Sequence, residues 1–489
     1  MVLLRGGRVI DPGTGLDAVA DVLVRDGKVA AVGPDLSHPD APVVDVTGLV
    51  VGPGFVDLHS HVHGVAGHRL QAFDGVTTAL DLESGLTPVE RGYAEAAAQG
   101  RPLNYGFSAS WGAARAAVLA GVEPDADFYS GLRVLDDPRW QRSSTPRELD
   151  TWLALLEREI GAGALGIGVL LGYAPRTDPA EFLAMAALSA RANSPMYTHV
   201  RQLVEANPAT PIDGSAELVR AAAETGAAMH HCHVNSTSLR HVDRVLGMLA
   251  KSREDGVRVS VECYPYGAGS TGVGAFFLEP ELLPASGIGP TDIVMVGTGE
   301  RVADEARLRH LRATDPGALC LVSFLDEANP ADEALLTRSL AFPDAIVASD
   351  AMPLEWPDGS HDSREWPLPP HGRTHPRTAG TFAKSLRRMV RETGTWTWPE
   401  AFRRCAYLPA RVLDQVAPAA TAKGHLGVGA DADLVVLDPT TVSDTATYQD
   451  PTRPSVGVHH LLVAGTFVIR DRELRQDAYP GRPLRGEPA

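Results

Sequence analysis

The sequence predicts an α/β protein, a TIM-type (β/α)8 barrel with a small β-sandwich domain formed by both termini. Two observations support this prediction. Across the middle of the 489-residue chain, eight apolar, β-rich runs alternate with helical stretches rich in Ala, Leu and Arg, which is typical of repeated βα units around a parallel sheet. At both ends of the chain, shorter β-rich runs are separated by turns instead of helices.

The two ends of the chain supply the strands of the expected β-sandwich. Near the N-terminus the β-rich runs are 2–5, 8–10, 21–25 and 28–32. Near the C-terminus they are 432–437, 460–464 and 467–470. Neither set contains enough strands for an independent sandwich. We therefore expect residues 1–53 and 416–489 to form one composite domain.

The eight runs of the middle segment are the expected barrel strands. They are 54–61, 77–83, 104–110, 165–172, 196–201, 228–234, 259–265 and 345–350. They place the barrel at residues 54–415. The stretch from about 266 to 344 is too long for a simple connection between strands seven and eight. Because it has β-rich pieces of its own at 293–296 and 319–324, we expect an inserted subdomain or lid there.

Charge and hydropathy narrow the choice of partners. The net charge is −17 at pH 7 and no basic block stands out, so nucleic acid and anionic membranes would be repelled. No run reaches the ~18 apolar residues of a membrane span, and the apolar stretch at the N-terminus is too short for a signal peptide. We expect a cytoplasmic protein whose partner is a small molecule, with a homo-oligomeric state left open.

His59 and His61 are the most informative residues of the chain. They end the apolar run that begins at Gly54. Side chains alternate across a strand, so both imidazoles point the same way and can share one metal ion. A single strand histidine is usually a core or surface residue, but two on one face indicate a metal site.

The C-terminal ends of other barrel strands carry further metal-competent groups. These are Asp81 and Glu83 on strand two, His199 on strand five, His231 and His233 on strand six, and Asp350 on strand eight. In a TIM-type barrel all these ends lie at the face that holds the active site. The four cysteines are far apart, without a CxxC pair. Imidazole and carboxylate ligands favour zinc, one or two ions, with other divalent transition metals as substitutes.

Strand parity leaves alternatives within two of these pairs. Asp81 and Glu83 face the same way; we choose Glu83, nearer the mouth, as the ligand, and Asp81 could orient a histidine. His233 is chosen over His231, which could lie beside the ligands or fill the core. His230 faces the other way and is expected to be structural. The expected ligands are therefore His59, His61, Glu83, His199, His233 and Asp350.

Seven short segments carry a family resemblance. They are Pro53-Gly54-Phe55 with the His59/His61 pair, 163–166 leading to 172–175, Thr198-His199-Val200-Arg201, Tyr264-Pro265-Tyr266 with 269–271, Ser349-Asp350, 375–382 and 429–435. The first six, in this order, resemble the D-aminoacylase branch of the amidohydrolase superfamily, which deacylates N-acyl-D-amino acids, and 429–435 resembles the C-terminal β segment of the superfamily. The version Leu80-Asp81-Leu82-Glu83 looks most like sequences labelled D-glutamate deacylase.

The chain departs from the resembled enzymes at three places. Many amidohydrolases bridge two metals with a carboxylated lysine on strand four, but residues 165–172 contain no lysine, which leaves Glu83 as the candidate bridge. D-aminoacylases typically have a metal-binding cysteine where this chain has Glu83, and a lysine where it has Asn235. For a substrate carboxylate, Arg201 and Arg377 remain as candidates because guanidinium binds carboxylates bidentately. Their alternative role is a structural salt bridge.

The resulting hypothesis is metal-assisted hydrolysis of an amide bond. A metal-activated hydroxide would attack, while Asp350 serves first as general base and then as general acid. Tyr173, Tyr264 and Tyr266 could donate to the developing oxyanion or shape the pocket wall. Two arginines in a partly dry pocket favour an anionic substrate such as N-acyl-D-glutamate. The alternatives are a cyclic amide hydrolase or deaminase of the same superfamily, which could act in secondary metabolism, and a non-catalytic barrel scaffold, which the intact ligand set disfavours.

Overall fold

The computed structural model describes residues 1–487. Two compact units can be distinguished within the chain. Unit 1 comprises Met1–Leu80, Glu95–Gly106 and Ile346–Leu484, and unit 2 consists mainly of Asp81–Ala94 and Phe107–Ala345.

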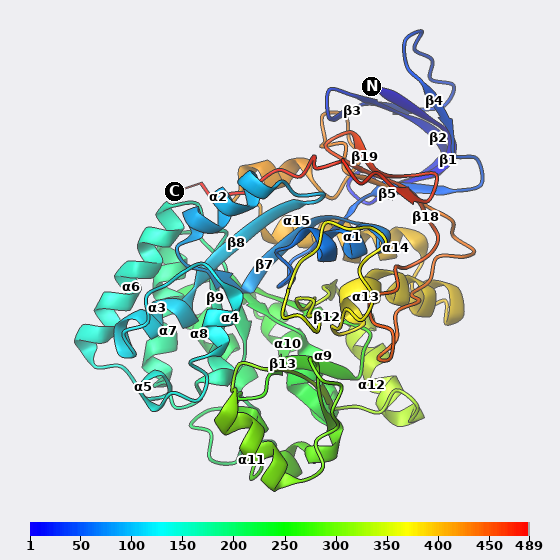
Figure 1. The fold of residues 1–489 in the computed structure, drawn as a ribbon. Helices are drawn as coiled ribbons and strands as arrows, with labels where there is room; N and C mark the ends of the chain where they lie inside the picture. The colour runs from blue at the N-terminus through cyan, green and yellow to red at the C-terminus, as the bar shows by residue number, and fades with distance from the viewer. Residues whose placement is uncertain (488–489) are drawn as a thin grey trace. The chain divides into compact units, whose positions relative to one another are not determined.

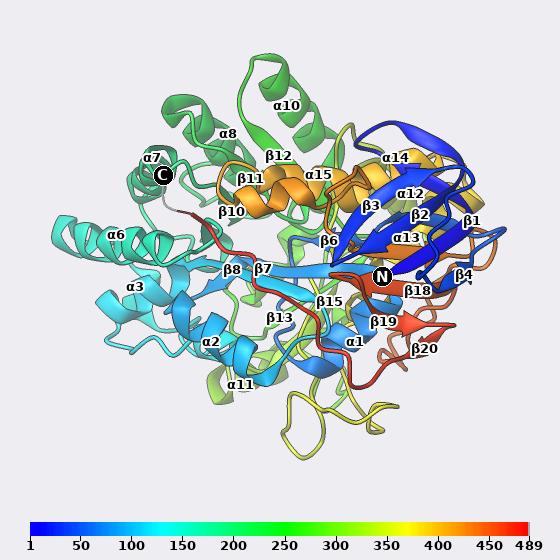
Figure 2. The same ribbon diagram turned by 90° about the horizontal axis from the view of Figure 1, so that it is seen from above.

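A nine-stranded sheet in unit 1 brings the two ends of the chain together (Figures 1 and 2). Its strands are β1 (Val2–Asp11), β2 (Leu16–Arg25), β3 (Lys28–Gly33), β4 (Val43–Asp45), β5 (Val50–Pro53), β17 (Leu434–Leu437), β18 (Val458–Val463), β19 (Thr466–Arg470) and β20 (Glu473–Leu474). The order is β20-β19-β18-β17-β5-β1-β2-β3, with β4 paired to β1. The antiparallel pair of β5 and β17 joins the N-terminal strands to the C-terminal ones. The termini thus meet in one β domain, while its limits at 53/54 and 415/416 stay a prediction.

The strands of this sheet bury an apolar core, for example with Val22 and Val24 of β2 and with Leu434 and Val436 of β17. The predicted separate runs 2–5 and 8–10 are wrong in one respect, because they form the single strand β1. A bulge between Leu4 and Gly7 interrupts its pairing with β2. Gly6 in the bulge has a φ of +76°, which glycine adopts without steric cost.

All eight predicted barrel strands are present. They are β6 (Phe55–Asp57), β7 (Val76–Leu86), β8 (Asn104–Ser110), β9 (Ile167–Leu170), β10 (Met196–His199), β11 (Met229–His231), β12 (Val259–Cys263) and β16 (Ile346–Val347). The sheet order follows the chain order, and neighbouring strands are parallel wherever register is defined. Helices intervene between consecutive strands, which gives the TIM-type barrel that the sequence predicts.

The helices divide between the two units. Unit 1 contains α1 (Val65–Phe73), α13 (Arg377–Leu386), α14 (Trp398–Phe402) and α15 (Leu408–Val412), and α2 (Val89–Gln99) crosses the unit boundary. Unit 2 contains α3 (Trp111–Leu119), α4 (Phe128–Leu132), α5 (Pro138–Gln141), α6 (Pro146–Gly161), α7 (Pro179–Arg191), α8 (Gly214–Thr225), α9 (Val234–Ser238), α10 (Val242–Glu254), α11 (Glu305–Thr314) and α12 (Pro330–Ala341). Both views show α6, α7 and α8 on the outer side of the unit 2 strands (Figures 1 and 2).

Local sequence explains where two of the outer helices begin. Thr145 and Glu148 form a capping box at α6, and Asp178 and Glu181 form one at α7. Each helix also has proline at its first position, where the missing N–H has no cost.

The segment between strands seven and eight has its own sheet. β13 (Ala268–Gly272), β15 (Leu319–Ser323) and β14 (Ile293–Met295) pair antiparallel in that order. The β-rich pieces expected at 293–296 and 319–324 are therefore strands, whereas β13 was not predicted because its Gly- and Ser-rich sequence has no β propensity.

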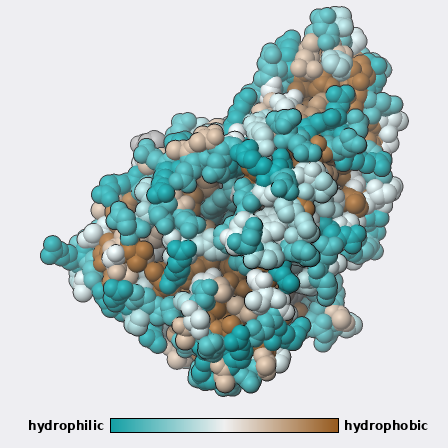
Figure 3. All heavy atoms as spheres, in the orientation of Figure 1, coloured by the Kyte–Doolittle hydropathy of each residue, from teal (hydrophilic) through white to brown (hydrophobic). Residues whose placement is uncertain are grey.

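The face in Figure 3 has hydrophilic side chains around smaller hydrophobic patches. Among the helices of residues 1–487, none combines the length and the apolar character needed to cross a membrane.

Candidate metal centre

His59, His61 and Asp350 form a cluster in unit 1, called here the His59 cluster. The Nε2 atoms of the two histidines are 3.1 Å apart, and they lie 3.4 and 3.6 Å from Oδ1 of Asp350. Both histidines are almost fully buried. They lie just beyond β6, where hydrogen bonds to Ala351 keep the backbone extended, so the predicted same-side orientation is preserved.

Asp57 anchors this cluster, and the sequence reasoning missed it. Its carboxylate accepts hydrogen bonds from the backbone N–H groups of His59 (3.2 Å) and Ser349 (2.9 Å), from the Ser349 hydroxyl and from Gln71 (3.0 Å). It therefore links the segment of His59 to the segment of Asp350. Complete burial is the main cause that raises the pKa of Asp57 to about 7. The available signal was its position two residues before His59 on the same strand face.

Asp350 occupies an unusual backbone position. Its φ is +50°, a left-handed conformation that non-glycine residues seldom adopt. Arg377, the first residue of α13 and fully buried, has its Nη2 atom 2.8 Å from Asp350 Oδ1. Arg377 is thus an ionic partner of the predicted general base.

Glu83, His199 and His233 form a second cluster in unit 2, called here the Glu83 cluster. Oε1 of Glu83 lies 2.7 Å from His233 Nε2 and 3.2 Å from His199 Nδ1. Glu83 and His233 are buried, whereas 13% of the His199 side chain is exposed. His233 has a φ of +28°, and Ser236 Oγ lies 2.9 Å from its Nδ1, which orients the ring.

The two other histidines of β11 have structural partners. His231 lies 3.0 Å from Ser215 Oγ through Nε2 and 3.1 Å from the Cys232 carbonyl through Nδ1. Burial is the main cause that lowers the pKa of His231 to about 3, so it is neutral near pH 7. It fills the core, one of the two roles expected for it.

His230 and Glu262 form a buried pair. His230 Nε2 lies 3.0 Å from Glu262 Oε2, and Oε1 of Glu262 accepts a hydrogen bond from the backbone N–H of His233 at 3.4 Å. His230 is structural, as expected. Sequence reasoning missed Glu262, although it stands near the end of predicted strand seven. Asp81 accepts a hydrogen bond from the Gly85 N–H at 3.1 Å, a turn contact that sequence reasoning did not predict.

Arg201 is engaged entirely by protein groups in its recorded contacts. It is fully buried, and its Nε and Nη2 donate to the two carboxylate oxygens of Glu217 at 2.9 and 3.0 Å. It also donates to the carbonyls of Pro175 and Thr177. The structure therefore gives Arg201 the structural salt bridge that was its alternative role in the sequence.

The three candidate tyrosines all lie buried in unit 2. The ring centroid of Tyr173 is 4.8 Å from that of His199, and Tyr264 lies 6.3 Å from His233. The Asn235 side chain holds the segment that carries Tyr264 and Tyr266. It donates a hydrogen bond to the Tyr266 carbonyl at 3.4 Å and accepts one from the Tyr264 N–H at 3.3 Å. Asn235 is thus a structural link at the position where resembled enzymes have lysine.

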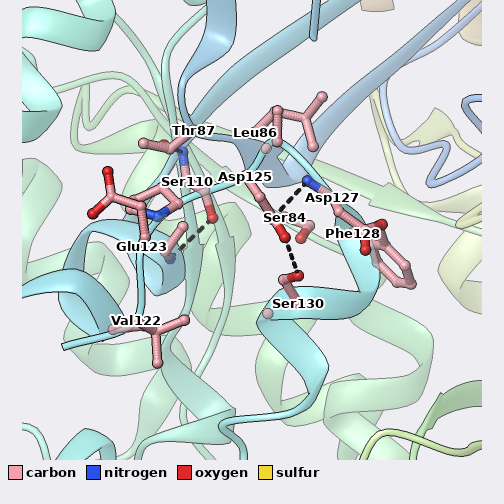
Figure 4. Close-up of a pocket in the computed structure, with 16 residues that line it drawn as sticks. Ser84, Leu86, Thr87, Ser110, Val122, Glu123, Asp125, Asp127, Phe128 and Ser130 are labelled. Carbon is pink, nitrogen blue, oxygen red and sulfur yellow. Dashed lines mark hydrogen bonds between the residues drawn. The ribbon is translucent and has the colours of Figure 1, made fainter. Parts of the chain in front are cut away.

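A pocket with about 420 Å³ of empty space lies beyond the ends of β7 and β8 (Figure 4). Ser84 of β7 and Thr87 just after it line the pocket, together with Glu123, Asp125 and Asp127 of the loop between α3 and α4. Asp125 accepts hydrogen bonds from the Ser130 hydroxyl (2.7 Å) and the Asp127 N–H (3.2 Å). None of the sixteen residues that line the pocket is basic, so the charge of the pocket does not favour an anionic substrate.

Both clusters fit a zinc ion by their donor atoms. In each, imidazole nitrogens and a carboxylate oxygen approach one another in a buried setting. The three donor atoms of the Glu83 cluster all lie within 4.8 Å of one another. Nitrogen and carboxylate ligands of this kind are those that zinc takes in catalytic sites.

Comparison with known proteins gives the chain its family. The family model described as "Amidohydrolase family" matches residues 42–469. The chain belongs to this family. A D-aminoacylase from Alcaligenes xylosoxydans xylosoxydans is 29% identical, with 96% of this chain and 95% of the relative covered. An N-acyl-D-glutamate deacylase of the same organism is 28% identical over 99% of this chain and 96% of the relative.

Solved structures of amidohydrolases resemble the whole chain. N-acyl-D-glutamate deacylase from Bordetella bronchiseptica, complexed with zinc and a phosphonate inhibitor, superposes with a TM-score of 0.77 at 26% identity, with 99% of both chains covered. A D-aminoacylase with a binuclear metal center has a TM-score of 0.76 at 25% identity and the same coverage.

Proposed function

We propose that the protein is a zinc-dependent hydrolase that cleaves the amide bond of N-acyl-D-amino acids. The observation that carries this proposal is the Glu83 cluster, in which one buried carboxylate oxygen lies within 3.2 Å of two histidine nitrogens. Relatives that are similar over nearly the whole chain are deacylases of N-acyl-D-amino acids, and the similar solved structure of N-acyl-D-glutamate deacylase from Bordetella bronchiseptica is a complex with zinc.

The residues of the two clusters have distinct proposed roles. His59, His61 and Asp350, and likewise Glu83, His199 and His233, would hold one or two zinc ions. Bound zinc would lower the pKa of water and polarise the scissile carbonyl. Asp350 accepts a proton from the attacking water and returns it to the departing nitrogen. Arg377 orients the Asp350 carboxylate through their 2.8 Å contact.

The substrate contacts are a further part of the proposal. Tyr173, beside the His199 ring, and Tyr264, beside His233, would line the pocket, as would Tyr266. The preference for acidic substrates was expected from two arginines. Arg201 no longer supports this preference, because its hydrogen bonds go to Glu217 and two backbone carbonyls. Of the two arginines, Arg377 alone remains as a candidate to bind a substrate carboxylate.

A substrate panel tests the proposed reaction. Zinc-loaded protein is assayed for amine release from N-acetyl, N-formyl and N-succinyl derivatives of D- and L-amino acids, with cyclic imides and an ammonia assay alongside. We expect turnover of D-derivatives with release of the free amino acid. Turnover of cyclic imides alone, or ammonia as the product, would replace the proposal by a cyclic amide hydrolase or a deaminase. A cytoplasmic location and a homo-oligomeric state stay predictions that fractionation and sedimentation can test.

A further inference from the structure

The inserted segment reaches the candidate ligand His199. The short helix η3 (Phe276–Leu278) follows β13, and the Phe277 ring stacks on the His199 ring with centroids 5.6 Å apart and planes at 12°. Tyr173 packs edge-on against Phe277 at 5.1 Å. The Tyr173 hydroxyl lies 2.9 Å from Thr271 Oγ1 of β13, so the insertion is tied to the loop after β9 on this side of His199.

This arrangement leaves an aromatic surface beside the accessible part of His199. Tyr173 is 8% exposed, Phe277 is half-buried, and 13% of the His199 side chain is exposed. A ring held in place and partly open to water can gain contact with an apolar group and lose little conformational freedom. Phe277 thus has the properties of a wall for an apolar substituent.

An exposed arginine packs against Phe276, the residue before Phe277. Arg176 stands three residues after Tyr173, and its Cζ lies 5.7 Å from the centre of the Phe276 ring. Arg176 is exposed, and within residues 1–487 the structure records no ion pair for it. It can therefore accept a carboxylate ligand, unlike the buried Arg201.

The backbone that presents Arg176 is held on both sides. Arg201 donates to the carbonyls of Pro175 and Thr177, and Ser143 Oγ donates to the Arg176 carbonyl at 2.8 Å. Three consecutive carbonyls are thus hydrogen-bonded to side chains. Such a rigid loop reduces the entropy lost when Arg176 binds a ligand.

We propose that Arg176 and Phe277 form a recognition surface beside His199, in which Arg176 binds the α-carboxylate of the substrate and Phe277 contacts an apolar side chain. This inference rests on the proposed function and specifies its substrate class. An acidic side chain would lie against the aromatic ring of Phe277, which offers it no positive charge. The surface therefore selects neutral, apolar N-acyl-D-amino acids over N-acyl-D-glutamate, which reverses the preference expected from Arg201 and Arg377.

Four substrates separate the two contacts. Acetate release is measured with N-acetyl-D-leucine, N-acetyl-D-leucinamide, N-acetyl-D-alanine and N-acetyl-D-glutamate. Arg176→Met should lower kcat/KM for N-acetyl-D-leucine about tenfold, chiefly through KM, because one charge-assisted contact is lost. N-acetyl-D-leucinamide has no carboxylate, so its kcat/KM should change by less than about twofold in the same variant. Arg176→Lys should restore part of the loss.

Phe277→Ala should lower the leucine-to-alanine ratio of kcat/KM by about tenfold, the scale of one apolar contact, and Phe277→Leu should lower it less. Unfolding midpoints and zinc content of each variant verify that it is folded and loaded. The matched control is Arg147→Met, which removes an exposed arginine of α6 and should change no ratio.

The outcomes distinguish this inference from the proposed function. The recognition surface is overturned, and the proposed function left intact, by the following result. Wild-type protein deacylates the panel, Arg176→Met leaves the leucine-to-leucinamide ratio of kcat/KM unchanged, and Phe277→Ala leaves the leucine-to-alanine ratio unchanged. Wild-type protein that prefers N-acetyl-D-glutamate also overturns it. If zinc-loaded wild-type protein deacylates nothing, both fail. Calorimetry with D-leucine gives a readout besides turnover, since its binding should weaken in Arg176→Met.

Discussion

Replacing Arg201 by methionine should destabilise the protein without changing its preference between acidic and neutral substrates. The guanidinium is fully buried and makes two hydrogen bonds to Glu217 and two to backbone carbonyls. Only 4% of the Glu217 side chain is exposed. Methionine fills similar space but leaves this carboxylate and the carbonyls of Pro175 and Thr177 without their donors.

The expected loss follows from that burial. Removing one partner of a buried ion pair costs ~3–5 kcal/mol. Burial already raises the pKa of Glu217, against the lowering effect of Arg201. In Arg201→Met this lowering effect is gone, so the pKa of Glu217 rises further. The carboxylate of the variant then becomes protonated as the pH falls, and the destabilisation should be smaller at pH 5 than at pH 8.

Urea unfolding followed by tryptophan fluorescence measures this loss at both pH values, with midpoints compared because a chain of this size need not unfold in one step. The double variant Arg201→Met/Glu217→Leu should recover part of the stability, because no unpaired charge remains buried. Activity on N-acetyl-D-glutamate and N-acetyl-D-leucine should fall by the same factor. A variant with the wild-type unfolding midpoint and a selective loss for the acidic substrate would refute the structural role of Arg201.

Three further predictions concern the metal, the proton transfer and a surface ion pair. Wild-type protein should contain one or two zinc equivalents, and Glu83→Ala should lose metal; full retention with normal turnover would remove Glu83 from the ligands. Asp350→Asn should lower kcat at least ~100-fold with zinc retained in elemental analysis, and an active variant would exclude Asp350 as the base. Hydrogen bonds from Arg142 are the main cause that lowers the pKa of Glu148 to about 2, so its stabilisation is present above pH 4.5 and lost as pH falls toward 2. Because that pair is partly exposed to solvent, Glu148→Gln should lower the stability measured by urea unfolding by less than ~1 kcal/mol at pH 7 and should not lower it at pH 2. An equal loss at both pH values would contradict the assignment.

The barrel was predictable because its signals are local. The run 104–110 coincides with β8 residue for residue, and every position in that strand is buried; its aromatic residues Tyr105 and Phe107 favour a strand. Strand ends were less predictable. The run 54–61 narrows to β6 at Phe55–Asp57, and beyond Asp57 the backbone groups of His59 and His61 are hydrogen-bonded to Ala351. Those contacts join residues nearly 300 positions apart, which no local pattern reveals.

The assignment of Arg201 shows where reasoning from strand ends reaches its limit. Its place after strand five predicts a group near the barrel mouth, but not which element packs against it. Gly214 begins α8 against the Arg201 backbone; an added Cβ there would lie 1.8 Å from the Arg201 carbonyl oxygen. This close approach brings Glu217 to the guanidinium. A glycine followed three residues later by an acid was therefore the only sequence signal of the buried pair.

Backbone conformation supplies independent support for two of the predicted functional residues. His233 and Asp350 both have positive φ, at +28° and +50°, although neither is glycine. Each such residue costs ~1–3 kcal/mol and persists only where its surroundings impose it. Around Asp350 the constraint comes from Asp57, which holds Ser349, and from the contact with Arg377; around His233 it comes from Glu262, which accepts its N–H. Backbone strain of this kind does not stabilise the fold. Its benefit is that buried carboxylates beside each cluster fix the direction of the His233 ring and of the Asp350 carboxylate.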